Sequence, residues 1–371
     1  MRDLLVIFSG YNQRAIIAFL RCLRMYDIED YVIVAASGSD TILLTDYAKK
    51  VFAVRENIGL DLNELTDILK RIRNHYGVQN MVIPPSTEAL DRFVLKNREK
   101  FEKIGCIIPL VNEKLYTELS DKETFYDLCR REGMAVPESM ELPDSFRKEF
   151  VAKPKVYMGS DNIAHAPRLI MNEADFKSFC SECIKTDYTC QEFIRGYSYY
   201  LFYYIFKDGR VVRFSQINYL QQPEGKSMVA AGVSDIHKEP IADAYERLLK
   251  KYGYYGFAMV EVRKRGDDYY MIEINPRFWG PSQLLVDAHC GLFEGFLREY
   301  GFLLDNQAKA APNKEAKYFW SDGFEGDIHE LNGFYWHEGG REAVLNDLEA
   351  FEDYDLLSRE DTLRISKRSL K

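Results

Sequence analysis

The chain has 371 residues, of which 46% are hydrophobic and 29% are charged, and its formal net charge is −9. This length favours two or three domains with a sizeable core. The lack of a basic excess argues against nucleic acid as the main partner, because few positive charges are available to neutralise phosphates. The apolar run at residues 4–8 is too short for a signal peptide or a membrane span, so we expect a cytoplasmic protein with no membrane partner.

Residues 1–115 alternate short apolar runs with amphipathic stretches. The patterns predict strands at residues 4–8, 31–37, 49–54 and 78–84, and helices at residues 13–26 and 62–76. Continuous apolar strands that alternate with helices predict a parallel, doubly wound α/β sheet.

This first domain has no strong nicotinamide signature. The loop after the first strand has a single glycine, Gly10, in place of GxGxxG, which argues against a nicotinamide-dependent enzyme. The loop can still hold an anion at a helix N-terminus. The sequence PPST at residues 84–87 follows another strand, on the side where such sheets bind ligands.

The pattern changes near residue 120. Ser120 and Glu123 have the spacing of a capping box, and Gly133 fits the end of the helix that would follow. Strands broken by turns, a helix at residues 240–253 and a hairpin at residues 256–275 then predict an α+β domain with antiparallel ribbons. The tyrosine-rich residues 197–206 are interpreted as core packing. We expect domains at residues 1–117 and 118–305, with residues 306–371 packing on the second as an extension.

The predicted hairpin has one apolar and one polar face. Alternation along its second strand places Ile272 and Ile274 on one side, with Glu273 and Asn275 on the other. A tight turn between the strands puts Glu261 of the first strand directly opposite Glu273. Two like charges in that position destabilise a sheet unless a cation lies between them.

A divalent cation would remove this repulsion. Two carboxylates and an amide oxygen are hard ligands that suit Mg²⁺, with Mn²⁺ as a possible substitute. Pro276 then ends the strand pairing, and the planar guanidinium of Arg277 suits a phosphate. The alternative is an ordinary amphipathic hairpin whose acidic side chains face water.

Other candidate residues are weaker when each is taken alone. Lys153 ends an apolar strand before a loop whose Gly159 and Ser160 offer backbone amides and a hydroxyl to phosphates, although a solvated lysine before a turn is the simpler interpretation. Residues 191–196, QEFIRG, end a strand. Its free backbone N–H and C=O groups can form hydrogen bonds with an adenine, and Phe193 or Ile194 can pack against the adenine ring. A plain strand end is the alternative there.

The order of these elements resembles the ATP-grasp superfamily, especially members like the carbamoyl phosphate synthase large chain and biotin carboxylase. EINPRFWG at residues 273–280 is the most specific element, and the resemblance covers about residues 1–300. It implies a Rossmann-like pre-ATP-grasp domain followed by an ATP-grasp fold, in which two α+β subdomains clasp ATP. The roles it implies are Mg²⁺ ligands for Glu261, Glu273 and Asn275, ATP phosphate contacts for Lys122 and Lys153, an adenine hinge at Glu192, Phe193 and Ile194, and a phosphate or acyl phosphate contact for Arg277.

The resemblance also implies an activity. Members of the family typically use ATP to convert a carboxylate into an acyl phosphate, which an amine then attacks to release phosphate. We therefore expect an ATP-dependent carboxylate–amine ligase with small-molecule substrates. Because many relatives dimerise, the resemblance also implies a homodimer. A kinase on the same fold and a nucleotide-binding regulator are the alternatives.

The substrate pocket and the ribose site are less well defined by the sequence. Ser198 or Tyr199 would replace the ribose-binding acid that many relatives have after the hinge glycine. Arg277, Trp279 and Ser282 are expected to line the substrate pocket together with PPST and Glu88.

Overall fold

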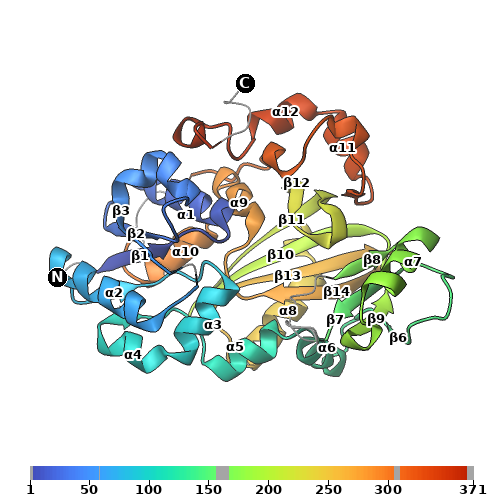
Figure 1. The fold of residues 1–371 in the computed structure, drawn as a ribbon, viewed down its shortest axis with the longest axis horizontal. Helices are drawn as coiled ribbons and strands as arrows, with labels where there is room; N and C mark the ends of the chain where they lie inside the picture. Colours follow the sequence, from blue (N-terminus) through green and yellow to red (C-terminus); the bar gives the residue numbers. More distant parts are fainter. Residues whose placement is uncertain (1–2, 58, 156–166, 305–309, 366–371) are drawn as a thin grey trace.

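The computed structural model describes residues 3–57, 59–155, 167–304 and 310–365, which form three sheets. Figure 1 shows a parallel sheet and its helices on one side of a long antiparallel sheet, with a smaller antiparallel sheet on the other side. No helix in the described ranges has both the length and the apolar character needed to cross a membrane.

The first sheet is parallel, with strand order β3-β2-β1-β4-β5, as the alternating sequence pattern predicts. Every residue of its two central long strands is buried, because helices cover both faces. Its strands are β1 (Leu4–Phe8), β2 (Tyr31–Ala35), β3 (Val51–Val54), β4 (Met81–Val82) and β5 (Cys106–Ile107), and its helices are α1 (Gln13–Met25), α2 (Leu62–Tyr76), α3 (Glu88–Lys96) and α4 (Arg98–Lys103).

Two helices, α5 (Glu113–Ser120) and α6 (Lys122–Arg131), connect the parallel sheet to the rest of the chain. The predicted capping box at Ser120 is wrong, because Ser120 ends α5 and donates its hydroxyl to the Tyr116 carbonyl at 2.8 Å. Asp121 caps α6 instead, by accepting a hydrogen bond from the Thr124 amide at 2.9 Å. This cap makes Lys122 the first residue of α6.

The smaller antiparallel sheet has strand order β6-β9-β7-β8 and packs against α7 (Glu173–Glu182). Its strands are β6 (Ser139–Met140), β7 (Phe150–Pro154), β8 (Arg168–Ile170) and β9 (Tyr188–Glu192). Alternation along β7 points Phe150 and Ala152 into the core under α7, so Val151 and Lys153 face the opposite side.

The long sheet has strand order β14-β13-β10-β11-β12-β15, and β16 pairs with β11. Helix α8 (Pro240–Lys251) packs on one face, while α1, α9 (Gln283–Asp287) and α10 (Leu292–Glu299) pack on the other. The strands are β10 (Tyr197–Ile205), β11 (Val211–Gln221), β12 (Met228–Val233), β13 (Gly256–Arg265), β14 (Asp268–Asn275), β15 (Lys317–Phe319) and β16 (Tyr335–Trp336).

Strand β10 lies in the middle of this sheet and contributes side chains to the hydrophobic cores on both of its faces. Leu201 and Tyr203 pack with α8, whereas Phe202 and Tyr204 pack with α1 and α10. The interpretation of the tyrosine-rich stretch as core packing is confirmed.

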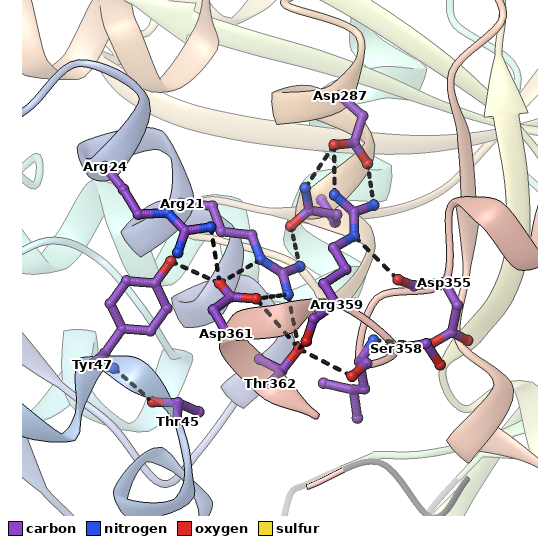
Figure 2. A network of polar contacts seen from close by, with 12 residues as sticks. Arg21, Arg24, Thr45, Tyr47, Asp287, Asp355, Ser358, Arg359, Asp361 and Thr362 are labelled. Atoms are coloured by element: carbon purple, nitrogen blue, oxygen red, sulfur yellow. Dashed lines mark hydrogen bonds and ion pairs between the residues drawn. The ribbon is translucent and has the colours of Figure 1, made fainter. Parts of the chain in front are cut away.

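The C-terminal segment adds β15 and β16 to the long sheet, followed by α11 (Gly340–Leu345) and α12 (Leu348–Asp353). Beyond α12 it reaches the first domain, where Asp361 accepts two hydrogen bonds from Arg21 of α1, at 2.9 and 2.7 Å (Figure 2). Tyr47 donates to the same carboxylate at 2.8 Å, and Arg359 binds Asp287 of α9 through both its terminal nitrogens. The division at residues 117 and 305 stays a prediction, because the described residues 310–365 share both a sheet and this network with what precedes them.

The Arg21–Asp361 pair gives a first testable prediction. Both side chains are almost fully buried, at 6% and 0% exposure, so Asp361→Ala leaves a buried guanidinium without a counter-charge. We expect a loss of about 3–5 kcal/mol in the free energy of unfolding, measured by urea denaturation at neutral pH. Asp353→Asn, which removes an exposed carboxylate from α12, serves as the matched control.

This contribution depends on pH in a defined direction. Burial alone would raise the pKa of Asp361, but the hydrogen bonds and charge of Arg21 hold it below its ordinary value. The stabilisation is therefore complete at neutral pH and is lost as the pH falls through the folded-state pKa. Equal stability of Asp361→Ala and the control at pH 7 would contradict this account of the network.

Candidate functional site

The hairpin formed by β13 and β14 has the predicted register, with Glu261 directly opposite Glu273. A β-bulge follows this pair, so that Val262 pairs with Met271 and Ile272 has no partner. Met271 and Ile274 therefore both enter the core, whereas Ile272 lines a cavity. The prediction that Ile272 shares the apolar face with Ile274 is wrong, because simple alternation does not continue through a bulge.

A cavity of about 660 Å³ lies between the smaller sheet and the long sheet. Val151, Leu169 and Ile272 supply apolar wall, which suits a flat ring, while the charged groups converge nearby. Seven of the predicted site residues line this one cavity: Lys122, Lys153, Glu192, Phe193, Ile194, Glu261 and Glu273. Ser160, together with Gly159, lies outside the described residues.

Two lysines enter the cavity from different elements. Lys153 is only 7% exposed, and its Nζ donates to the Tyr126 hydroxyl at 2.5 Å. Lys122, at the start of α6, contacts Glu273 with 3.2 Å between Nζ and Oε2. Burial and the nearby charge of Lys122 lower the pKa of Lys153 to about 7. A bound polyanion would favour the charged form of Lys153, because opposite charges attract more strongly where water is excluded.

The two carboxylates have unequal surroundings. Glu261 is 5% exposed and, within the described part of the chain, has no hydrogen bond or ion pair. Burial and the negative charge of Glu273 raise the pKa of Glu261 to about 7. For Glu273, burial also acts to raise the pKa, but Lys122 and a hydrogen bond from Asn275 outweigh it and lower the pKa.

Asn275 and Arg277 lie at the edge of the site and are not among the residues that line the cavity. Asn275 Nδ2 donates to Glu273 Oε1 at 2.9 Å, and Arg277 donates to Asn275 Oδ1 at 3.0 Å. These bonds link Arg277 to Lys122 through Glu273. The next residue, Phe278, donates its amide to the Pro85 carbonyl at 2.8 Å, so the strand end touches the PPST loop of the parallel domain.

These residues fit a divalent cation. A buried carboxylate without a partner, directly opposite a second carboxylate, is costly unless positive charge is added between them. Among the described residues no group of three or more His, Cys, Asp or Glu side chains is gathered. Glu261, Glu273 and the Asn275 amide form a smaller donor set. Such a small set suits Mg²⁺, which keeps waters and phosphate oxygens as further ligands.

The predicted hinge joins the two sheets where β9 passes into β10. Phe193 and Ile194 line the cavity, and Arg263 donates to the Ile194 carbonyl at 3.0 Å while its guanidinium carbon lies 4.8 Å from the centre of the Phe193 ring. The Glu192 side chain is bonded to Arg265 at 2.6 Å. Ser198 is fully buried and accepts a hydrogen bond from Asn218, and neither Ser198 nor Tyr199 lines the cavity, so their expected contact with ribose stays a prediction.

Sequence reasoning missed part of the cavity wall. Gln221 at the end of β11 and two residues of the connection to β12, Glu224 and Lys226, line the cavity, although nothing in this sequence marks it as a binding loop. Arg263 and Tyr200 also face the cavity, and both could have been found: Arg263 lies two residues after Glu261 on the same strand, and Tyr200 pairs directly with Glu261.

Three residues expected in the substrate pocket form contacts within the protein. Trp279 is 2% exposed and stacks on Phe202 with 4.5 Å between ring centres. Ser282 is fully buried and donates to the Trp279 carbonyl at 2.6 Å. Glu88 forms an ion pair with Arg92 on the surface of α3. Trp279 and Ser282 are too buried to line an open pocket, because the chain turns inward directly after Arg277. A place for Glu88 in the substrate pocket stays a prediction.

A cavity between two antiparallel sheets, preceded by a parallel α/β domain, is the architecture of the ATP-grasp fold, and comparisons with known proteins agree. The family model described as the ATP-grasp domain matches residues 119–281. Residues 119–281 are therefore similar to the ATP-grasp domain family, and the chain shares the ATP-grasp fold. The comparison with curated protein sequences finds no match.

Solved structures share this fold at low sequence identity. The biotin carboxylase domain of Hydrogenobacter thermophilus 2-oxoglutarate carboxylase, solved with MgADP and bicarbonate, matches with a TM-score of 0.56 and 12% identity over 84% of this chain and 72% of that chain. Campylobacter jejuni biotin carboxylase gives a TM-score of 0.55 and 13% identity, covering 82% and 72%. Thermotoga maritima N5-carboxyaminoimidazole ribonucleotide synthetase gives a TM-score of 0.54 and 13% identity. The match covers 85% of this chain and 79% of that chain.

The hinge gives a second prediction, through Gly196. Its φ of 140° is rarely adopted by other residues, and a Cβ there would lie 1.9 Å from the backbone oxygen of Lys264. Gly196→Ala must therefore displace the hinge, and we expect it to lose about 1–3 kcal/mol of stability and to bind ADP more weakly. Urea denaturation and calorimetric titration with ADP measure both effects.

Gly209→Ala is the matched control, because Gly209 also has a positive φ, of 87°, but has open space where a Cβ would lie. It should lose stability through backbone strain alone and bind ADP as the unaltered protein does. Equal ADP affinity for Gly196→Ala and Gly209→Ala would contradict a hinge role for this turn.

Proposed function

We propose that the protein is an ATP-dependent ligase that phosphorylates a small-molecule carboxylate and joins the resulting acyl phosphate to an amine. The observation that carries the proposal is the convergence of Lys122, Lys153, Glu261 and Glu273 in a cavity that ends at the hinge. Two cations and two closely spaced anions are the complement of a metal-bound polyphosphate.

Each residue has a role that follows from its position. Phe193 and Ile194 would bind the adenine, and Lys122 and Lys153 would hold phosphate oxygens as point charges. Arg277 has a planar guanidinium near the junction with the parallel domain, which suits the transferring phosphoryl group and the acid that receives it.

Glu261, Glu273 and Asn275 would hold Mg²⁺, which would neutralise charge on the phosphates during transfer. Asn275 would turn its amide oxygen from Arg277 toward the cation, and this rotation would free the guanidinium for the substrate. The lysines and Arg277 orient the two reacting groups, which is the main protein contribution to phosphoryl transfer.

Glu273→Gln tests the metal site. The substitution removes half of the opposed carboxylate pair, so we expect normal folding without nucleotide and a loss of turnover of at least about 100-fold. Wild-type protein should gain about 2.7 kcal/mol of stability when Mg-ADP is present at 100 times its Kd, and the variant should lose most of that gain. Thermal unfolding measured with Mg-ADP, and again with ADP and EDTA, separates the stabilisation that depends on the metal from that given by the nucleotide alone.

The control for Glu273→Gln is Asp268→Asn, which removes an exposed carboxylate from the far end of the same strand. It should keep the Mg-dependent stabilisation and the activity. Retention of both by Glu273→Gln would remove Glu273 from the metal site.

Lys153→Met tests the phosphate contact. Methionine fills similar space without placing a charge in a buried position, so the variant should fold at least as well as wild type. Its ATP affinity should fall by at least about tenfold, or about 1.4 kcal/mol. Lys155→Met changes an exposed lysine two residues away and should bind ATP normally, as calorimetric titration would show.

The products of turnover test the reaction class. Incubation with Mg-ATP, a panel of carboxylates and a panel of amines should release ADP and phosphate when both substrates are present. AMP and pyrophosphate in their place would exclude acyl phosphate formation. A stable phosphorylated product with no second nucleophile would identify a kinase.

A further inference from the structure

A second, narrow cavity lies in the parallel domain and shares no lining residue with the cavity between the two antiparallel sheets. It opens where β1 and the PPST loop end, at the carboxyl edge of the parallel sheet, which is where open α/β sheets bind ligands. Its apolar walls come from Phe8, Leu60 and Leu90, and its polar groups include Arg55 and Ser86.

Arg55 is buried and forms no ion pair with the described residues. It is 4% exposed, its Nη1 donates to the Gly59 carbonyl at 3.1 Å, and its Nε has no partner among the described residues. No carboxylate oxygen of the described residues lies within 4 Å of its guanidinium. The charge of Arg55 helps to lower the pKa of Glu64, but the Glu64 carboxylate binds the backbone amide of Glu56.

Such a group is costly to keep. A buried guanidinium with one hydrogen bond and no ion pair is only partly compensated for its lost hydration, so its retention in a cavity wall points to an anionic ligand. The fork of N–H groups matches the two oxygens of a carboxylate or a phosphate.

Ser86 supplies a second free donor. It is 2% exposed, and its hydroxyl has no partner among the described residues, although it lines the same cavity. Thr87 next to it caps α3 by accepting from the Leu90 amide at 3.2 Å, so the positive end of that helix also faces the cavity. The nearby Ser9 hydroxyl is already engaged, because it donates to Asp40 at 2.6 Å.

The cavity is joined to the nucleotide site by backbone contacts. Asn12 donates to the carbonyls of both Ser86 and Phe278, at 3.0 and 3.1 Å. Arg277 donates to that same Phe278 carbonyl at 2.8 Å. A ligand held beside Ser86 would therefore lie on a loop that is fixed against the strand end carrying Arg277.

We propose that this cavity binds an oxyanion group of the acid substrate, a carboxylate or a phosphate, through Arg55, Ser86 and the first turn of α3. This inference rests on the proposed ligase function and names its substrate class: an acid with a second anionic group, remote from the carboxylate that is phosphorylated. Phe8, Leu60 and Leu90 supply the apolar lining beside these polar groups.

Calorimetric titration of the full chain tests the proposal. Saturating Mg²⁺ and AMPPNP, an ATP analogue that does not transfer its terminal phosphate, would first fill the phosphate positions of the nucleotide site. Inorganic phosphate and malonate are then titrated separately, and the tighter anion identifies the group. We expect one anion per chain in wild type and binding weakened at least about tenfold in Arg55→Gln.

Two further variants keep the test decisive. Ser86→Ala removes a hydroxyl that has no protein partner, so it should fold normally and still weaken anion binding. Arg73→Gln removes a cation of the same domain whose Nη1 donates to the Ile104 carbonyl, outside the cavity, and should bind the anion as wild type does.

Wild-type affinity in both Arg55→Gln and Ser86→Ala, or no anion uptake by wild type, would overturn the proposal. Failure of wild type to bind Mg-AMPPNP would contradict the proposed function instead. In that case the same anion titrations without nucleotide still show whether the cavity binds an anion. The proposal requires a lower anion affinity in Arg55→Gln than in Arg73→Gln.

Discussion

The carboxylates of Glu261 and Glu273, opposed across two paired strands, set the main electrostatic constraint on this structure. Their repulsion is only partly offset, because Lys122 contacts Glu273 while the buried Glu261 has no close partner in the described part of the chain. Lys153 is buried on the facing sheet, with its pKa lowered to about 7. The cluster is thus an incomplete set of charges, which a metal ion and a polyphosphate together would complete. Sites organised for a charged ligand commonly sacrifice stability in this way.

The fold brings these charges together from separate segments. Lys153 lies on the smaller sheet, the two glutamates lie on the long sheet, and the turn at Gly196 links the sheets. The parallel domain is tied to the same strand end through Asn12, and the C-terminal segment is tied to the parallel domain through Asp361. Asn12 also ties the PPST loop, whose Ser86 lines a cavity together with the buried Arg55, to the Phe278 carbonyl next to Arg277.

Much of this arrangement could be predicted from local sequence patterns. Apolar periodicity indicated the parallel domain, and the hairpin spacing indicated the Glu261–Glu273 register, because both depend on neighbours in sequence. The bulge at Ile272 was missed, since an extra residue in a strand leaves no mark in its composition. Trp279 and Ser282 were misplaced because the direction of the chain after Arg277 is fixed by packing against Phe202. Arg55 was missed for a related reason: a single arginine after a strand resembles a surface residue until its burial is known.

Transfer of oxygen from the acid to phosphate is the most direct test of the central claim, that this site phosphorylates a carboxylate. The measurement uses the acid that supports ADP release, labelled with ¹⁸O in its carboxylate, with Mg-ATP and the amine. Attack of a carboxylate oxygen on the γ-phosphorus, followed by displacement by the amine, predicts one ¹⁸O atom in each phosphate released. Phosphate free of ¹⁸O, with the acid still consumed, would contradict an acyl phosphate intermediate and the account of the site given above.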